Sequence, residues 1–289
     1  MNRNQVFHQL LHSGDDILVA PGAANAITAR LIEEAGFPVT YITGAGLSNS
    51  MLGLADVGLL SFKEVLDQVK YICDAIEIPV IADGDTGFGN AVNTIRTVKE
   101  FEKAGVSAIQ LEDQFTPKKC GHFEGKQIVP VSEMVNKIKA AVDARQDQHF
   151  KIIARTDARA IEGFDSAIER AEQFIEAGAD ITFVEAPQSV AEMQTIPERL
   201  GSTPQVANMV EHGKTPLVVN DELEKMGFKL VLYANFLQRR AIRAMQEALE
   251  GLKNENTTSA FMDEIISMKE RNRLTRLDEI KKLEEQFMK

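Results

Sequence analysis

The chain has 289 residues, of which 44% are hydrophobic and 26% are charged. This composition excludes a disordered or fibrous protein and predicts a globular protein with a sizeable core. The 43 acidic and 32 basic residues give a formal net charge of −11. Because that charge repels nucleic-acid backbones and anionic lipid surfaces, we expect no nucleic-acid and no membrane partner.

The apolar runs have the length of strands, and the first 14 residues are too polar for a signal peptide, so we expect a cytoplasmic protein. Two cysteines, Cys73 and Cys120, cannot form a disulfide framework. No closely spaced cluster of cysteine and histidine predicts structural zinc.

Short β-rich runs alternate with amphipathic stretches up to about residue 251. Eight candidate strands occur, at residues 17–21, 39–43, 80–83, 108–112, 151–155, 181–185, 205–208 and 229–233. A helical pattern follows each strand. In the stretch 61–76, Ser61 and Glu64 form a capping box, and the apolar residues fall on one stripe.

Eight strand-then-helix units without a linker-like tract predict one parallel (β/α)8 barrel of the TIM type, and an open doubly wound sheet is the alternative. We expect a single domain over residues 1–289, with the barrel at about 15–251 and a helical extension at about 253–289. The apolar positions of that extension need a surface to cover, either on a partner subunit or within the same chain. The polar connection 114–130 is long enough to act as a lid.

The catalytic sites of parallel barrels lie at the carboxyl ends of the strands, and these ends are acidic here. The third strand ends in Asp83, followed by Asp85, and the two side chains share a side if the chain is extended. Glu112 and Glu185 end the fourth and sixth strands. Single acids of this kind are often helix caps or surface carboxylates, but several that converge favour a bound Mg²⁺ or Mn²⁺.

Other strand ends supply groups that could bind an anionic substrate. Arg155 ends the fifth strand and could clamp a carboxylate with its planar fork, or form a structural ion pair with a neighbouring acid. Asn208, at the end of the seventh strand, adds an amide. Thr43, Gly44 and Ala45 follow the second strand and could offer backbone N–H groups to an anion.

The long connection contains Cys120 between Lys118 and Lys119 on one side and Gly121 and His122 on the other. Electropositive surroundings lower the pKa of a thiol, so Cys120 is a candidate proton donor, acceptor or nucleophile, although an incidental loop thiol is the alternative. Cys73 lies on a helix stripe among apolar residues and is expected to be inert core.

Five motifs together resemble the isocitrate lyase and phosphoenolpyruvate mutase superfamily, most closely its 2-methylisocitrate lyase and 2,3-dimethylmalate lyase branches. They occur in order over about residues 21–233: Thr43-Gly-Ala-Gly46, Asp83-Gly-Asp85-Thr-Gly-Phe-Gly, Glu112-Asp-Gln, Lys118-Lys-Cys120-Gly-His122 and Arg155-Thr-Asp157-Ala. The loop motif with Cys120 is specific to the carbon–carbon lyases of this superfamily.

The resemblance implies a homotetramer whose eighth barrel helix is exchanged between subunits, and Mg²⁺ that holds a 2-hydroxy acid. It assigns the substrate contacts to Tyr41, Thr43, Gly44, Ala45, Asp83, Gly121, Arg155, Glu185 and Asn208, and the metal shell to Asp56, Asp83, Asp85 and Glu112. The implied reaction is a retro-aldol-type cleavage of a 2-hydroxy di- or tricarboxylate to a 2-oxo acid and a carboxylate. The catalytic groups would be Cys120, Lys119, His122, Arg155 and Glu112, with Cys120 as the thiol that protonates the enolate.

Two departures leave alternatives open. His212 stands where the nearest lyases would have glycine, and the segment from Tyr233 to Arg240 resembles the phosphonomutase branch. A phosphonopyruvate- or carboxyphosphonoenolpyruvate-type mutase or hydrolase is therefore one rival reading. A non-catalytic barrel that binds a ligand is another. A Schiff-base aldolase would need a lysine at the carboxyl end of a strand, whereas Lys151 and Lys229 begin theirs.

Overall fold

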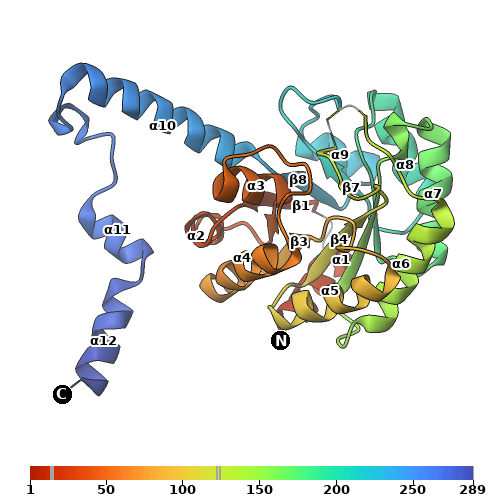
Figure 1. The fold of residues 1–289 in the computed structure, drawn as a ribbon, viewed down its shortest axis with the longest axis horizontal. Coiled ribbons are helices and arrows are strands. Elements are labelled where there is room, and N and C mark those ends of the chain that lie inside the picture. Colours follow the sequence, from red (N-terminus) through yellow and green to blue (C-terminus); the bar gives the residue numbers. More distant parts are fainter. Residues whose placement is uncertain (14–15, 122, 124, 289) are drawn as a thin grey trace. The chain divides into compact units, whose positions relative to one another are not determined.

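A computed structural model describes residues 1–13, 16–121, 123 and 125–288. Eight parallel strands form one sheet in the order β6-β5-β4-β3-β2-β1-β8-β7. The two outer strands, β6 and β7, meet through an isolated parallel bridge between Thr182 and Gln205, whose side chains are also hydrogen-bonded at 2.6 Å. The sheet is thus a nearly closed barrel with helices around it (Figure 1), and the predicted (β/α)8 architecture is confirmed over the open doubly wound alternative.

All eight predicted strands are present, and their ends lie within two residues of the prediction. The strands are β1 (Leu18–Ala23), β2 (Thr40–Ile42), β3 (Val80–Asp83), β4 (Ala108–Glu112), β5 (Lys151–Thr156), β6 (Ile181–Val184), β7 (Val206–Asn208) and β8 (Leu230–Tyr233). Most are buried along their whole length, as expected for strands covered on both faces of a parallel sheet.

Amphipathic helices precede, connect and cover the strands. They are α1 (Arg3–Ser13), α2 (Ala26–Glu34), α3 (Gly44–Leu52), α4 (Phe62–Ala75), α5 (Ala91–Lys103), α6 (Val131–Ala144), α7 (Phe164–Glu176), α8 (Val190–Leu200) and α9 (Asn220–Met226), with a 3₁₀ turn at Ala158–Ala160. The capping box of α4 is confirmed, because the Ser61 N–H donates to Glu64 Oε2 at 2.8 Å and the Ser61 side chain accepts from the Glu64 N–H.

The barrel interior is apolar toward the amino ends of the strands. Phe7 and Leu11 of α1 are buried in one cluster with Leu18, Val39 and other residues that begin the strands. Helix α1 therefore plugs this end of the barrel. The polar residues that end the strands remain at the opposite end, where parallel barrels carry their sites.

The chain divides into two compact units, Met1–Gln238 and Arg239–Lys289, so the division falls earlier than the expected boundary near residue 253. The second unit contains most of α10 (Phe236–Glu255), a 3₁₀ turn at Ser259–Phe261, α11 (Met268–Leu274) and α12 (Leu277–Phe287). Its helical pattern is confirmed, whereas the surface that its apolar positions cover stays a prediction. Across the described parts of the chain, every helix is too short or too polar to cross a bilayer.

Candidate active site

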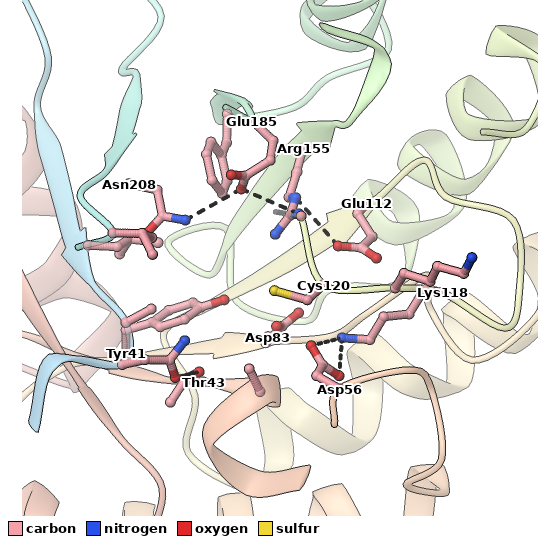
Figure 2. A pocket seen from close by; sticks show the side chains of 18 residues that line it. Tyr41, Thr43, Asp56, Asp83, Glu112, Lys118, Cys120, Arg155, Glu185 and Asn208 are labelled. Atoms are coloured by element: carbon pink, nitrogen blue, oxygen red, sulfur yellow. Dashed lines mark hydrogen bonds and ion pairs between the residues drawn. The ribbon is translucent and has the colours of Figure 1, made fainter. Parts of the chain in front are cut away.

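A small cavity opens at the carboxyl ends of the strands (Figure 2). Residues from β2 to β8 and from the connection 114–130 line it together. They are Tyr41, Thr43, Ala45, Asp56, Asp83, Glu112, Lys118, Lys119, Cys120, Gly121, Arg155, Phe183, Glu185, Asn208, Val210, Leu232, Ala234 and Asn235.

The structure brings most of the predicted site residues to this cavity. Gly44 and Asp85 are not among its lining residues but lie directly behind it: a Cβ built on Gly44 would be 2.8 Å from Asp83 Oδ2 and 3.4 Å from Asp85 Oδ1. A side chain at position 44 would therefore require the Asp83 carboxylate to shift. His122 lies outside the described residues.

The ammonium of Lys118 is the centre of an acidic group of side chains. Its Nζ lies 2.7 Å from the Asp56 carboxylate and 2.8 Å from Asp85 Oδ1, and its side chain is only 5% exposed. Burial by itself lowers the pKa of Lys118, but the nearby carboxylates of Asp85, Asp83, Glu112 and Asp56 outweigh burial and hold that pKa well above its usual value. Lys118 is therefore a buried cation.

A turn brings Asp83 and Asp85 together. Asp83 ends β3, but Asp85 has a left-handed φ of 47°, and its N–H donates to Asp83 Oδ1 at 3.1 Å. The expected convergence of the two acids is confirmed, although the expected cause, side-chain alternation along an extended strand, is wrong. The turn after the strand, rather than the strand itself, aims Asp85 at Lys118.

The carboxylates of Asp56, Asp83, Asp85 and Glu112, with the ammonium of Lys118, form one half of the site, which we call the acidic half. These carboxylates have too few cations nearby. Burial, together with the charges of Asp83 and Asp56, raises the pKa of Asp85 to about 6 against the opposing effect of Lys118. Burial also raises the pKa of Glu112 well above its usual value, although Arg155 opposes this. Glu112 Oε1 is buried without a hydrogen-bond partner in the described structure.

These residues fit a hard divalent cation in their chemistry. All the donors are carboxylate oxygens, which suit Mg²⁺ or Mn²⁺, and an added cation would relieve their mutual repulsion. In the described residues, no group of three acidic, histidine or cysteine side chains is already arranged around one ion position. The Lys118 ammonium lies between Asp56 and Asp85 instead, so an ion would bind beside it or displace it.

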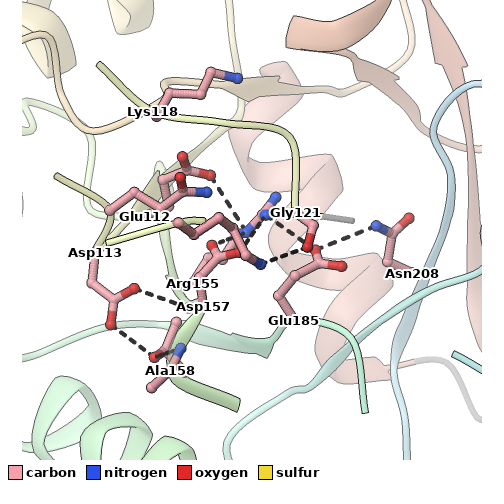
Figure 3. Close-up of polar contacts among 12 residues, drawn as sticks. Glu112, Asp113, Lys118, Gly121, Arg155, Asp157, Ala158, Glu185 and Asn208 are labelled. Carbon is pink, nitrogen blue, oxygen red and sulfur yellow. Dashed lines mark hydrogen bonds and ion pairs between the residues drawn. The ribbon is translucent and has the colours of Figure 1, made fainter. Parts of the chain in front are cut away.

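Arg155 is the centre of a second half (Figure 3), and its Nε also lies 3.4 Å from Glu112 Oε2. Its Nε and Nη2 donate to the two oxygens of Asp157 at 2.9 and 3.1 Å, and Nη2 lies 3.3 Å from Glu185 Oε2. Asn208 Nδ2 donates to the same Glu185 oxygen at 3.4 Å. The ion pair that was the alternative to a substrate clamp is thus present, and it leaves the Arg155 guanidinium beside the cavity that the residue also lines, so the role of a clamp stays a prediction.

The Asp157 carboxylate has two cationic neighbours. Burial by itself would raise its pKa, but Arg155 and Lys126 outweigh burial and lower the pKa to about 2. Asp113, next to Glu112, supports this arrangement from behind, because its Oδ1 accepts the Asp157 N–H at 2.9 Å and its Oδ2 accepts the Thr156 hydroxyl at 2.7 Å.

Residues 118–121, which we call the Cys120 segment, are held against both halves. The Cys120 N–H donates to the Asp56 carbonyl at 3.1 Å, and the Gln114 side-chain amide both donates to and accepts from the Lys119 backbone at 2.8 Å. A Cβ on Gly121 would lie 2.4 Å from Arg155 Nη2 and 2.8 Å from Glu185 Cδ. Glycine is therefore needed for the backbone to approach this ion pair.

Neutral hydrogen-bonding groups line the cavity where it meets α3. Thr43 caps the helix by accepting from the Gly46 N–H, and its hydroxyl donates to Asn235 Oδ1 at 2.9 Å. Thr43 and Ala45 both line the cavity, so the amino end of α3 adjoins it. Helix amino ends attract anions.

Two residues near the site, Asn235 and Lys126, were absent from the predicted set, and Lys118 was predicted only as a loop cation. The ammonium of Lys118 points into the acidic half, whereas the ammonium of Lys119 donates a hydrogen bond to the Gly125 carbonyl at 3.0 Å. The Lys-Lys pair signalled a cation but not which lysine points inward. Asn235, directly after β8, could have been found as a polar residue at a strand end, whereas nothing in the pattern marked the buried Lys126.

Comparisons with known proteins extend these observations. The family model for phosphoenolpyruvate phosphomutase matches residues 7–253. The 2,3-dimethylmalate lyase of Eubacterium barkeri is 49% identical over 288 residues, which cover 99% of both chains. The 2-methylisocitrate lyase of Aeropyrum pernix is 43% identical over 88% of this chain and 82% of its own.

A solved structure of phosphonopyruvate hydrolase in complex with oxalate and Mg²⁺ matches with a TM-score of 0.90, 31% identity and full coverage of both chains. Lyases and an enzyme of phosphonate chemistry therefore share this barrel, so the fold alone does not choose between them. The family match and the identities over nearly the whole length agree with the motifs at the strand ends. The chain belongs to the phosphoenolpyruvate phosphomutase family.

Proposed function

We propose that the protein is a Mg²⁺-dependent carbon–carbon lyase that cleaves a 2-hydroxy dicarboxylate of the 2,3-dimethylmalate type. The C2 hydroxyl of that substrate gives up its proton to a base or to water as the C2–C3 bond breaks and pyruvate forms, and the remaining fragment becomes propanoate when its former C3 takes up one proton. The 49% identity to a 2,3-dimethylmalate lyase over nearly the whole chain supports this choice.

One observation carries the proposal. The thiol of Cys120 lines the same cavity as the carboxylates of Asp83 and Glu112 and the guanidinium of Arg155. A proton donor, an oxygen-only cation site and a carboxylate clamp around one small volume are the groups that this cleavage needs. Cys73, by contrast, is buried, and burial raises its pKa to about 12, so it remains an inert thiol.

Asp83, Asp85, Glu112 and Asp56 would hold the metal ion, directly or through water. Bound there, Mg²⁺ would polarise the hydroxyl and carboxylate oxygens of the 2-hydroxy acid. The E. barkeri and A. pernix relatives are lyases by name, and the phosphonopyruvate hydrolase structure contains Mg²⁺ with oxalate, a small dianion. Mn²⁺ would suit the same oxygen ligands.

The residues of the chain have separate tasks in this proposal. Tyr41, Thr43, Gly44 and Ala45 would bind the 2-oxo-acid end of the substrate at the amino end of α3. Arg155 would bind the carboxylate of the other fragment, together with Gly121, Glu185 and Asn208. Lys118, Lys119 and His122 would add positive charge, and the Cys120 thiol would give its proton to the carbon that leaves as an enolate.

The cavity also supports a dicarboxylate over a tricarboxylate. Its wall at β6 to β8 consists largely of Phe183, Val210, Leu232 and Ala234. This wall suits methyl substituents, and the described lining residues from β6 to β8 include no cation for a third carboxylate. A 2-methylisocitrate-type substrate would have to place its extra carboxylate elsewhere.

The test is a lyase screen that detects 2-oxo acids in the presence of Mg²⁺, with the 2-hydroxy acids 2,3-dimethylmalate, 2-methylisocitrate, citramalate and isocitrate. We expect 2,3-dimethylmalate to have the highest kcat/KM and the reaction to stop when EDTA removes the metal. No 2-oxo acid from any of the four compounds would refute the lyase assignment.

A second candidate is a phosphonopyruvate-type mutase or hydrolase. Asn235, in the segment that resembles the phosphonomutase branch, accepts a hydrogen bond from Thr43 inside the cavity. Phosphorus NMR with phosphonopyruvate distinguishes the two functions, because only the second candidate changes the carbon–phosphorus bond.

We also propose a homotetramer in which α10 packs on a partner subunit. Ile242, Met245, Leu249 and Leu252 recur on one stripe of this helix, and each is more than 40% exposed. Light scattering coupled to size-exclusion chromatography is expected to give four times the chain mass of 32.0 kDa, and Leu249→Glu is expected to lower that mass.

A further inference from the structure

Lys126 lies at the far end of the long connection and reaches back toward Cys120. Its side chain is 2% exposed, and its ammonium donates to the Gly121 carbonyl at 2.5 Å and to Asp157 Oδ1 at 2.6 Å. One buried cation thus joins the residue after Cys120 to the acid that orients Arg155.

A buried ammonium is costly unless its donors are satisfied by good acceptors. Lys126 meets that condition only while the Gly121 carbonyl and Asp157 keep their present separation. The ammonium therefore fixes the distance between the Gly121 carbonyl and the Asp157 carboxylate, in addition to neutralising that carboxylate. Gly121 in turn has little room to move toward Arg155, because a Cβ at this position would already lie 2.4 Å from Arg155 Nη2 and 2.8 Å from Glu185 Cδ.

We propose that Lys126 is a positioning residue: it fixes the position of the Cys120 thiol relative to the substrate carboxylate that Arg155 would bind. This inference rests on the lyase function proposed above. The ammonium pulls the Gly121 carbonyl toward Asp157, while the Cys120 N–H is anchored on the Asp56 carbonyl. The thiol is thus fixed between the acidic half and the Arg155 half. Lys126 itself neither gives nor takes a proton.

Lys126→Met keeps the length of the side chain and removes its charge and donors. We expect kcat with 2,3-dimethylmalate to fall about 100-fold, as for a proton donor displaced by roughly 1 Å, while KM changes less than about threefold because Asp157 still orients Arg155. Amide hydrogen exchange at Cys120 and Phe123, whose N–H groups donate to the Asp56 and Cys120 carbonyls, is expected to accelerate about tenfold or more.

Lys151→Met is the matched control. Lys151 is also buried and pairs with an aspartate, Asp180 at 3.3 Å, but it begins β5 at the opposite end of the barrel. It therefore reproduces the loss of a buried lysine–aspartate pair without touching the Cys120 segment. We expect it to lower the melting temperature and to leave both kcat and the exchange of these two amides within about twofold of the wild type.

The outcomes separate the inference from the function on which it rests. Hydrogen exchange needs no substrate, so it decides whether Lys126 holds the segment even if no 2-hydroxy acid is cleaved. Unchanged exchange in Lys126→Met overturns the inference, and so does faster exchange with unchanged kcat in an active enzyme. If Lys126→Met does not fold, Asp157→Asn tests the same contact from its other partner, and exchange at Cys120 and Phe123 equal to that of the wild type overturns the inference.

Discussion

The two halves of the site at the barrel mouth differ in how far cations neutralise their buried carboxylates. In the acidic half, the carboxylates of Asp56, Asp83, Asp85 and Glu112 lie around one buried ammonium, that of Lys118. In the Arg155 half, the cations Arg155 and Lys126 face the carboxylates of Asp157 and Glu185, and Arg155 Nε also lies 3.4 Å from Glu112 Oε2, so Glu112 links the two halves.

This difference between the halves is reflected in the pKa values of their aspartates. The pKa of Asp85 is raised to about 6, chiefly by burial, whereas the pKa of the fully buried Asp157 is lowered to about 2 by its two cations. The acidic half therefore lacks positive charge that the Arg155 half already has. A divalent ion supplies what is missing in one half and would be repelled by the cations of the other.

The largest effect is expected from the thiol that lies between the halves. Cys120→Ser replaces an acidic thiol by a much weaker acid, so kcat is expected to fall about 1,000-fold or more. The increase in melting temperature on addition of Mg²⁺ should remain, because the substitution leaves the four carboxylates in place. Cys73→Ala is the control, since that thiol is 1% exposed in the core and should leave kcat unchanged. Near-normal turnover of Cys120→Ser would remove the thiol from the mechanism.

The charge deficit of the acidic half can be tested by neutralising one acid. Asp83→Asn keeps the shape of the side chain and is expected to weaken Mg²⁺ binding about 100-fold, or about 2.7 kcal/mol, as measured by isothermal titration calorimetry. Asp157→Asn removes the same charge from the Arg155 half and is expected to leave the affinity for Mg²⁺ nearly unchanged. Equal losses in the two variants would show that the halves do not differ as proposed.

The close approach of the Cys120 segment to the Arg155 half gives a third prediction. Gly121→Ala places a Cβ 2.4 Å from Arg155 Nη2, so either the loop or the guanidinium must shift. A shift near 1 Å is expected to lower kcat/KM about 100-fold, with little change in Mg²⁺ affinity. A crystal structure of the variant would show which partner moves, and unaltered kinetics would mean that the contact relaxes without consequence.

The sequence predicted the fold well because each strand ends where apolar residues give way to polar ones. It also predicted the strand-end acids, since the carboxyl ends of parallel strands meet at one rim. The turn after β3 was harder: Asp85 reaches Lys118 through a left-handed residue, and side-chain alternation gave the correct grouping for the wrong reason.

The connection 114–130 limits what sequence can predict about the site. Lys118 and Lys119 are chemically identical neighbours, and only the path of the backbone decides that Lys118 is buried while Lys119 turns to Gly125. Lys126 was not recognised because its acceptors, Gly121 and Asp157, are brought together by tertiary structure alone. Local patterns carry no information about such contacts.

The smallest predicted effect concerns the pH dependence of stability in the Arg155 half. The pKa of Asp157 is about 2 in the folded protein and about 3.9 in an unfolded chain, so its ionised form stabilises the fold above about pH 4. That contribution, about 2–3 kcal/mol, is lost progressively as the pH falls from about 4 through 2. The unfolding free energy of the wild type, measured with urea, should therefore exceed that of Asp157→Asn by an amount that shrinks between pH 5 and pH 3. A difference that stays constant over this range would show that the Asp157 carboxylate is not stabilised by Arg155 and Lys126, and the contrast between the two halves would then lose its electrostatic basis.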